Sequence, residues 1–190
     1  KEQGTEAIFK SKTKVFLIEH GLFRRRSVLK KYYKKKIAES EHSIVIVTPY
    51  FIPHRWLVKA IGSAVKRGVR VEVILPMKTD LAIADAANWI SAEELSNRIS
   101  FLFLPEMNHA KVLLVDGKEG MVGSNNIDAR SFDLNLETGI VFQRKDMILD
   151  LEEILKKWRE SATPYEKLPL WHPWYYQIVK FFIKLISPSL

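Results

Sequence analysis

The most informative stretch of the chain is HAKVLLVDGKEGMVGSNNIDARSFDLNLE, which runs from His109 to Glu137. His109 and Lys111 are two residues apart at the start of a predicted strand over residues 110–115, so their side chains are expected on one face. A neutral imidazole can act as a nucleophile or as a general acid–base near pH 7. An adjacent ammonium group binds phosphate oxygens and stabilises charge that grows on them. The pair therefore predicts chemistry on a negatively charged substrate.

Small and polar residues follow this pair in the run Gly123-Ser124-Asn125-Asn126. Glycine permits a close approach of the backbone, and the side chains of Ser124 and Asn126 offer neutral hydrogen-bond donors to oxyanion positions. These two side chains could instead cap a helix over residues 127–133. We favour a phosphate contact for both, and more strongly for Asn126.

The two carboxylates of the stretch that matter most receive different interpretations. Glu137 lies in a predicted strand over residues 136–142, where it could accept the second imidazole N–H and fix the tautomer, or pair with Arg130. Asp116 ends a strand just before Gly117, a position more typical of a structural, turn-forming acid than of a proton carrier.

The spacing of these residues is similar to a known signature. His109-x-Lys111, four residues, Asp116, six residues and Gly123-Ser124-x-Asn126 resemble the HKD motif of the phospholipase D superfamily. The resemblance to its bacterial cardiolipin synthase form covers roughly residues 37–142 and includes Asp128, Arg130, Ser131, Asn135, Glu137, TPYFIP at Thr48–Pro53 and the run from Ala64 to Pro76.

This resemblance implies an α/β fold, a phospholipase D-like α/β/α sandwich with a mixed central sheet that represents one HKD half. It implies catalytic roles for His109, Lys111, Asp116 and Glu137, and phosphate binding by Lys111, Ser124 and Asn126. Our own interpretation of Asp116 from its position stays structural.

The chain departs from the family pattern in two ways. The residue after TPYFIP, usually acidic in the family, is His54 here. The superfamily active site uses two HKD motifs, whereas none of the other four histidines is followed two residues later by lysine. The second motif is therefore expected from another copy of the chain or from sequence outside it.

The resemblance also implies a two-step transfer without a metal or another cofactor. One histidine attacks phosphorus and forms a phosphohistidine, while the other protonates the leaving alcohol and then deprotonates the incoming one. The implied donor is phosphatidylglycerol or a similar phospholipid, and the acceptor is a second lipid alcohol. In a carboxy-terminal half, His109 is the expected acid–base partner; in a symmetric homodimer, either copy could take either role.

The composition of the 190 residues, with 47% hydrophobic and 27% charged side chains, is that of a folded domain. The absence of cysteine excludes disulfides, thiol nucleophiles, thiolate zinc sites and iron–sulfur clusters. A net charge of +8 favours anionic partners such as nucleic acid, acidic lipid headgroups or phosphorylated metabolites. Because the chain begins at Lys1 and shows neither a signal peptide nor ~20 consecutive apolar residues, we expect a piece of a longer protein whose spanning anchor, if any, lies upstream.

The alternation of strand and helix patterns predicts a largely parallel or mixed sheet covered by helices. Strands are expected over residues 15–18, 43–48, 69–75, 99–104, 110–115, 120–122 and 136–142. Helices are expected over residues 27–41, 56–66, 81–95, 146–158 and 174–186. We divide the chain into an extension (1–25), a catalytic domain with a single HKD motif (26–163), and a proline-punctuated linker with an apolar aromatic helix (164–190).

Two segments outside the motif suggest contact with a surface. The run from Arg24 to Lys36 holds eight cations and no acid. It could be the solvated face of an amphipathic helix, a contact to an anionic membrane at ~1 kcal/mol per cation, or a nucleic-acid contact. Its tyrosines have the spacing of a core stripe rather than of a base-stacking surface.

The terminal segment WHPWYYQIVKFFIKLISPSL is nearly all apolar. Its predicted helix would cover about 20 Å, short of the ~30 Å hydrocarbon core of a bilayer. We hypothesise that it lies in the membrane interface, with Trp171, Trp174, Tyr175 and Tyr176 at headgroup level. The alternative is burial against the domain or a partner.

The sequence thus predicts a phosphatidyltransferase of the cardiolipin synthase and phospholipase D type, located at the cytoplasmic face of a bacterial inner membrane. The expected partners are an anionic phospholipid such as phosphatidylglycerol, a membrane surface, and a second HKD half or a homodimer partner. Two other functions stay open. One is a single-motif endonuclease or phosphodiesterase that acts on nucleic acid as a homodimer, and the other is a non-catalytic module that binds phosphate or lipid.

Overall fold

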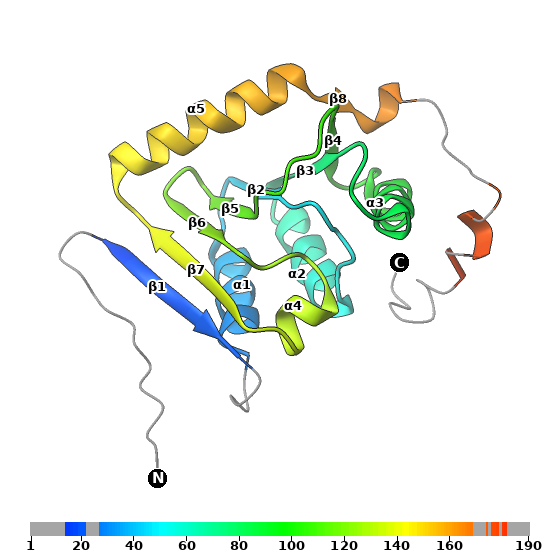
Figure 1. The fold of residues 1–190 in the computed structure, drawn as a ribbon. Coiled ribbons are helices and arrows are strands. Elements are labelled where there is room, and N and C mark those ends of the chain that lie inside the picture. Colours follow the sequence, from blue (N-terminus) through cyan, green and yellow to red (C-terminus); the bar gives the residue numbers. More distant parts are fainter. Residues whose placement is uncertain (1–13, 22–26, 169–173, 175, 179, 182–190) are drawn as a thin grey trace, which may run out of the picture.

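The computed structural model describes residues 14–21, 27–168, 174, 176–178 and 180–181. These residues form one eight-stranded sheet in the order β1-β7-β6-β5-β2-β3-β4-β8 (Figure 1). The strands are β1 (Val15–His20), β2 (Ser43–Val47), β3 (Arg70–Pro76), β4 (Ser100–Leu104), β5 (Val112–Val115), β6 (Glu119–Gly123), β7 (Glu137–Phe142) and β8 (Thr163–Pro164). The pairs β2–β3 and β3–β4 are parallel and the other pairs are antiparallel, which confirms the predicted mixed sheet.

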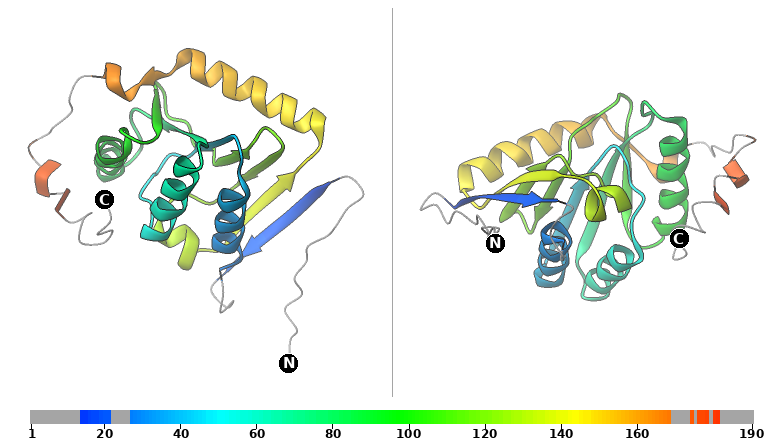
Figure 2. Two further views of the ribbon diagram at one scale, coloured as in Figure 1. Left: turned by 180° about the vertical axis from the view of Figure 1, so that it is seen from behind. Right: turned by 60° about the horizontal axis from the view of Figure 1, so that its bottom comes forward.

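Helices cover both faces of this sheet. They are α1 (Val28–Glu39), α2 (Arg55–Lys66), α3 (Ala82–Leu95), α4 (Ala129–Asp133) and α5 (Lys145–Ser161), followed by the short 3₁₀ helix η1 (Tyr165–Lys167). Figure 2 shows α1 and α2 on one side of the sheet and α5 on the other. The expected α/β/α sandwich is therefore the observed architecture.

The central strands are apolar on both faces because both faces are covered. In β2, Ile44 and Ile46 belong to the larger core beneath α1, α2 and α3. Val45 and Val47, which alternate with them, belong to a second core beneath α5. The continuous run SIVIV, without polar interruption, reflects this burial on both sides.

Helix α1 follows the apolar stripe of its sequence. Leu29, Tyr33 and Ile37 recur every fourth residue and are all buried. The Ser27 side-chain oxygen accepts a hydrogen bond of 3.1 Å from the Lys30 backbone N–H and so caps the helix. The lysines of α1 therefore lie on the sides of the helix that do not face the core.

Both edges of the sheet use residues near the ends of the described chain. Strand β1 pairs antiparallel with β7, with Val15 opposite Phe142 and His20 opposite Glu137. Strand β8 pairs with β4, with Thr163 opposite Phe103. The two-residue β8 was not expected, because so short a strand leaves no periodic pattern in the sequence. The sheet thus includes residues on both sides of the range 26–163.

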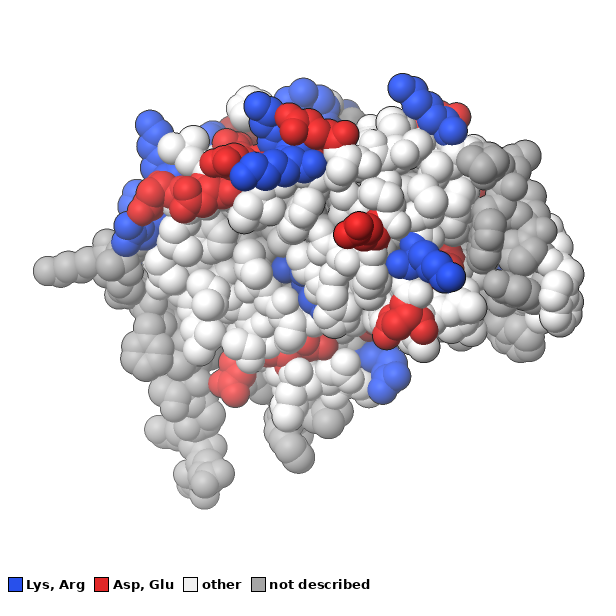
Figure 3. Space-filling view, turned by 45° about the horizontal axis from the view of Figure 1, so that its top comes forward, with Lys and Arg blue, Asp and Glu red and all other residues white. Residues whose placement is uncertain are grey.

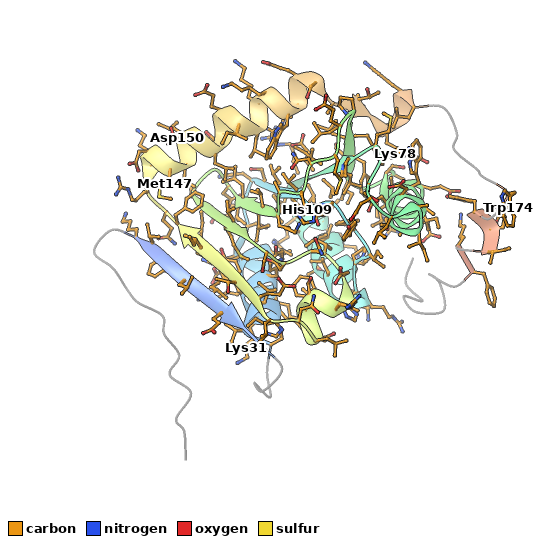
Figure 4. The ribbon with its side chains drawn as sticks, viewed as in Figure 1. Lys31, Lys78, His109, Met147, Asp150 and Trp174 are labelled. Carbon is orange, nitrogen blue, oxygen red and sulfur yellow. The ribbon has the colours of Figure 1, made fainter. Side chains whose placement is uncertain are left out.

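The expected helix over residues 174–186 is described in part. Tyr176 is buried and its hydroxyl donates to Glu93 of α3, while the Lys180 Nζ lies 3.0 Å from the same carboxylate. Trp174 is 86% exposed (Figure 4). Trp171 and Tyr175 of the proposed aromatic belt lie outside the described residues. Within the described ranges, the helices are all too short or too polar to cross a bilayer.

Candidate active site

The site lies at one end of the sheet, where three chain segments meet. Strand β5 runs antiparallel to β2, with Val112 opposite Val47, so the residues before β5 lie beside those after β2. Strand β7 begins at Glu137 at the same end. This topology brings His109 and Lys111 close to Tyr50, which follows β2 in the sequence. Figure 4 places His109 at this junction.

Lys111 is the buried cation of the site, with only 7% of its surface exposed. Its Nζ donates a hydrogen bond of 2.7 Å to the backbone carbonyl oxygen of His109, so the ammonium group is anchored to the backbone of the histidine. Burial lowers the pKa of Lys111, and the nearby carboxylates of Glu137, Asp80 and Asp128 oppose this effect. The negative charges of these three acids therefore favour the charged form of this one ammonium group.

His109 is exposed in the loop before β5, and its ring contacts Tyr50. The two ring centroids are 6.5 Å apart and the rings are nearly perpendicular, an edge-to-face arrangement. The Tyr50 hydroxyl donates to Asp80 in the loop between β3 and α3. That hydrogen bond, with some burial, raises the pKa of Tyr50 to about 12. Tyr50 is thus a neutral side chain, fixed by its hydrogen bond to Asp80, that packs against the imidazole ring.

Sequence reasoning assigned no role to Tyr50 or Asp80. Tyr50 lies in TPYFIP, a run whose resemblance to the family was noted, so a signal was present. Asp80 carried no signal, because only the crossover from β3 brings it to the site.

The hydrogen-bond partners of Glu137 differ from those that the sequence predicted. Its carboxylate accepts hydrogen bonds from the Ser124 hydroxyl and from the Asn135 side-chain amide, the latter at 3.2 Å. Neither the His109 imidazole nor Arg130 is among its hydrogen-bond or ion-pair partners in the described part of the chain. The reason is geometric: Glu137 lies within the ladder of β7 beside the end of β6, whereas His109 lies outside the strand.

The turn after β6 requires glycine at its start. A Cβ at Gly123 would lie 2.7 Å from the Thr138 carbonyl oxygen and 3.0 Å from the Gly139 Cα, both backbone atoms that cannot yield cheaply. Glycine therefore allows β6 to approach β7 closely enough to place Ser124 against Glu137.

The capping alternative for Ser124 and Asn126 is wrong. Asp128 caps α4, because its side chain accepts a 2.7 Å hydrogen bond from the Ser131 backbone N–H. The Asn126 side-chain oxygen is buried without a hydrogen-bond partner. An orphaned polar atom of this kind is a group that a ligand can satisfy.

Asp116 lies at the opposite end of β5 and takes no part in this grouping. Its carboxylate accepts hydrogen bonds from the backbone N–H groups of Glu41, His42 and Ser43, at 3.0, 2.8 and 2.8 Å. Its φ of 54° places it in the left-handed region, in a tight turn before Gly117. The structural interpretation of Asp116 fits this position, and the catalytic role implied by the resemblance does not.

Two hollows of the molecule lie away from the candidate site. Two hollows of about 720 and 790 Å³ lie at the other end of the sheet; Gly117 lines both and Asp116 the first. Neither hollow includes His109 or Lys111. Among the described residues, there is no cluster of three or more His, Asp or Glu side chains arranged to hold a metal ion.

Known proteins of one family match most of this chain. The profile of a family described as "Cardiolipin synthase, PLD-like domain" matches residues 33–159. A cardiolipin synthase of Listeria monocytogenes is 34% identical over 95% of this chain and 38% of its own length. Cardiolipin synthase 1 of Staphylococcus epidermidis is 31% identical over 83% of this chain and 33% of its own length. The chain thus spans little more than a third of these relatives.

Solved structures share the fold at low sequence identity. Phosphatidylserine synthase of Haemophilus influenzae superposes with a TM-score of 0.70 and 19% identity, over 93% of this chain and 48% of that one. The phospholipase D family member Nuc of Salmonella typhimurium gives 0.65 and 19%, over 80% of this chain and 97% of that one.

Proposed function

Because the chain belongs to the cardiolipin synthase family of phospholipase D-like domains, we propose that it supplies one HKD half of a phosphatidyltransferase. The observation that carries this proposal is the contact between the Lys111 ammonium group and the His109 carbonyl oxygen. It anchors the Lys111 ammonium group, the proposed phosphate ligand, to the backbone of a histidine whose side chain is exposed.

The proposed reaction needs two imidazoles. A nitrogen of the first attacks phosphorus and forms an N–P bond as the bond from phosphorus to the leaving oxygen breaks, and the second, protonated, donates its proton to that oxygen. The second imidazole, now neutral, takes the proton of the incoming alcohol, whose oxygen displaces the first imidazole from phosphorus. A single His109 cannot be bonded to phosphorus and also carry this proton.

The charges of the site lead to the same requirement. The negative charges of Glu137, Asp80 and Asp128 already act on the one ammonium group of Lys111. A phosphodiester adds a further negative charge, so this half alone is a poor anion site. A second HKD half, from elsewhere in the protein or from another copy, brings another lysine and the other histidine.

The remaining site residues take supporting roles in this proposal. Lys111 and Asn126 contact the phosphate oxygens, Asn126 through its amide N–H after rotation of the side-chain amide. Ser124 donates to Glu137 here, so it positions that carboxylate, and Tyr50 fixes the imidazole plane. The donor is an anionic phospholipid such as phosphatidylglycerol, which implies work at a membrane, with the cytoplasmic face of a bacterial inner membrane as the proposed place.

A chimera tests this function with the second half supplied. The matching segment of the Listeria monocytogenes relative is replaced by this chain, and cardiolipin is measured in vesicles containing phosphatidylglycerol. We expect cardiolipin from the chimera and none from its His109→Asn variant. The matched control is His42→Asn, an exposed histidine at the other end of the sheet, which should retain activity. A folded chimera that makes no cardiolipin, or whose His109→Asn variant stays active, overturns the proposal.

A nuclease or other nucleic-acid phosphodiesterase is the second candidate, favoured by the cations of α1 and α2. The same preparations are therefore incubated with single-stranded DNA. Cleavage that depends on His109, without cardiolipin formation, would select this function.

A further inference from the structure

Helices α1 and α2 carry most of the net charge of the molecule. Helix α1 contains five lysines and one glutamate, and α2 contains three cations and no acid, a net charge of +7 for the pair. The whole chain has a net charge of +8. The two helices pack side by side on one face of the sheet, so this charge is concentrated in one layer of the fold.

Four of these cations form an exposed group that we call the basic face: Lys31, Lys34, Arg55 and Lys59. In the described part of the chain, none of the four forms an ion pair with an acid. Figure 4 places Lys31 at the outer edge of the molecule. By contrast, Lys36 is partly buried and its Nζ lies 2.9 Å from the Glu119 carboxylate.

The opposite face of the molecule has a different charge pattern. Along α5, positive and negative side chains alternate and pair with each other, as Lys156 with Glu160 and Lys157 with Glu153 (Figure 3). The basic face therefore differs from α5, where these cations are balanced by neighbouring acids.

The aromatic residues of α1 favour a lipid surface over nucleic acid. Base stacking needs exposed rings, but Tyr33 is only 2% exposed and Asn125 donates to its hydroxyl. The Tyr32 hydroxyl is turned inward to Glu119 at 2.8 Å. The partly buried Trp56 ring of α2 lies below Lys34, whose Nζ is 5.6 Å from the ring centroid, and packs edge-to-face on Phe132. Exposed cations without an acidic partner match a surface of diffuse negative charge, such as an anionic bilayer.

The basic face also lies next to the candidate active site. The carboxylate of Asp133, at the end of α4, forms a hydrogen bond of 2.9 Å with the side chain of His54, which precedes α2. The same carboxylate lies 3.9 Å from the Nζ of Lys30 in α1. The first turns of both helices are thus joined to the element that follows Asn126. We propose that the basic face docks on an anionic bilayer and brings the His109 end of the sheet toward the lipid headgroups.

This proposal concerns binding and needs no turnover, so its test is separate from that of the transferase. The 190-residue chain is sedimented with phosphatidylcholine vesicles that do or do not contain phosphatidylglycerol. The test variant replaces all four cations of the basic face by Gln. Each cation near an anionic surface contributes about fivefold to binding, so we expect the variant to lose at least ~10-fold in partitioning at ~0.1 M salt.

The matched control removes four exposed cations outside α1 and α2: Lys118, Lys145, Lys156 and Lys157, each changed to Gln. It has the same net charge, and it should lose no more than ~3-fold through long-range electrostatics. Circular dichroism checks that both variants are folded. Equal losses in the two variants, or undiminished binding of the test variant, overturn the proposal. So does a test variant that keeps vesicle binding and loses only single-stranded DNA binding.

Discussion

At the scale of single residues, Asp116 shows how a motif position can serve the fold. Partial burial would raise the pKa of its carboxyl group, but the hydrogen bonds from Ser43, Glu41 and His42 outweigh burial and lower it. Because the pKa in the folded state lies below the unfolded value of about 3.9, the ionised form stabilises the fold above that pH, and this stabilisation is lost as the pH falls through the folded-state value.

Asp116→Asn is therefore expected to lower the free energy of unfolding by about 1–2 kcal/mol at pH 7. An Asn amide can occupy the same left-handed conformation, but it presents one acceptor oxygen in place of two. Urea unfolding at pH 7 and at about pH 3 measures the effect, and the deficit should shrink at the lower pH. The control is Asp150→Asn on the exposed side of α5. A deficit of the same size at both pH values would contradict this account.

Lys111 gives the second prediction at this scale. Lys111→Met keeps most of the length of the side chain and removes its charge, so the active site of the chimera loses its proposed phosphate-binding cation. We expect transfer activity to fall by roughly 10²–10³-fold. Lys118→Met, an exposed lysine in the turn after β5, is the matched control. A loss below tenfold would show that Lys111 does not contact the phosphate.

The sequence predicted the members of the site better than their contacts. The Lys111 ammonium group lies against the His109 backbone, but β5 begins only at Val112, and Lys111 is buried whereas His109 is exposed. The shared strand face expected for the two side chains stays a prediction. The partners of Glu137 were wrong, because they depend on the turn after β6 and on the loop that holds Asn135. Tyr50 lies at the site because β2 pairs with β5, and Asp80 reaches it through the crossover from β3, which no local pattern encodes.

At the scale of elements, the buried carboxylate of Glu119 connects α1 to the sheet. It accepts hydrogen bonds from the Tyr32 hydroxyl at 2.8 Å, from Lys36 at 2.9 Å and from the Gln143 side chain. Burial, followed by the charge of Glu119 and the hydrogen bond to it, raises the pKa of Tyr32 well above its usual range. The hydroxyl therefore stays a donor at any ordinary pH.

Glu119→Gln should destabilise the fold by about 2 kcal/mol, because its amide nitrogen then faces groups that themselves donate. The matched control is Glu160→Gln, whose exposed pair with Lys156 should be worth less than ~0.5 kcal/mol. Both values come from urea unfolding at pH 7. Equal effects in the two variants would mean that Glu119 contributes no more than a surface ion pair.

Elements with a strong local signal were predicted almost to the residue. The β-branched run of β2 and the Ala-rich helix α3 are examples, since burial on both sides leaves a continuous apolar pattern. The pairing of β1 with β7 was not predicted, because register between distant strands follows from the whole sheet.

At the scale of the whole molecule, the fold presents one half-site. Lys111 and His109 lie at one end of the sheet, where the charges of three acids act on Lys111. The charge of the chain lies instead on α1 and α2. We therefore expect the layer of α1 and α2 to contact the membrane. The end of the sheet that carries His109 is expected to contact the second HKD half.

Any turnover by the 190-residue chain alone should therefore come from pairs of chains. In a two-fold dimer both histidines of a site come from different copies, so a His109→Asn copy inactivates every site that it joins. Suppose that wild-type and variant dimers are mixed in equal amounts. After the subunits have exchanged, about one quarter of the dimers contain two wild-type chains, whereas without exchange about one half do. The assay measures hydrolysis or transfer of a labelled phosphatidylglycerol in mixtures of wild-type and variant chains. The activity should be proportional to the square of the wild-type fraction. In addition, the specific activity of the wild-type chain should rise with protein concentration. Activity that is linear in protein and indifferent to the variant would show that one imidazole suffices, and the two-histidine mechanism would fail with it.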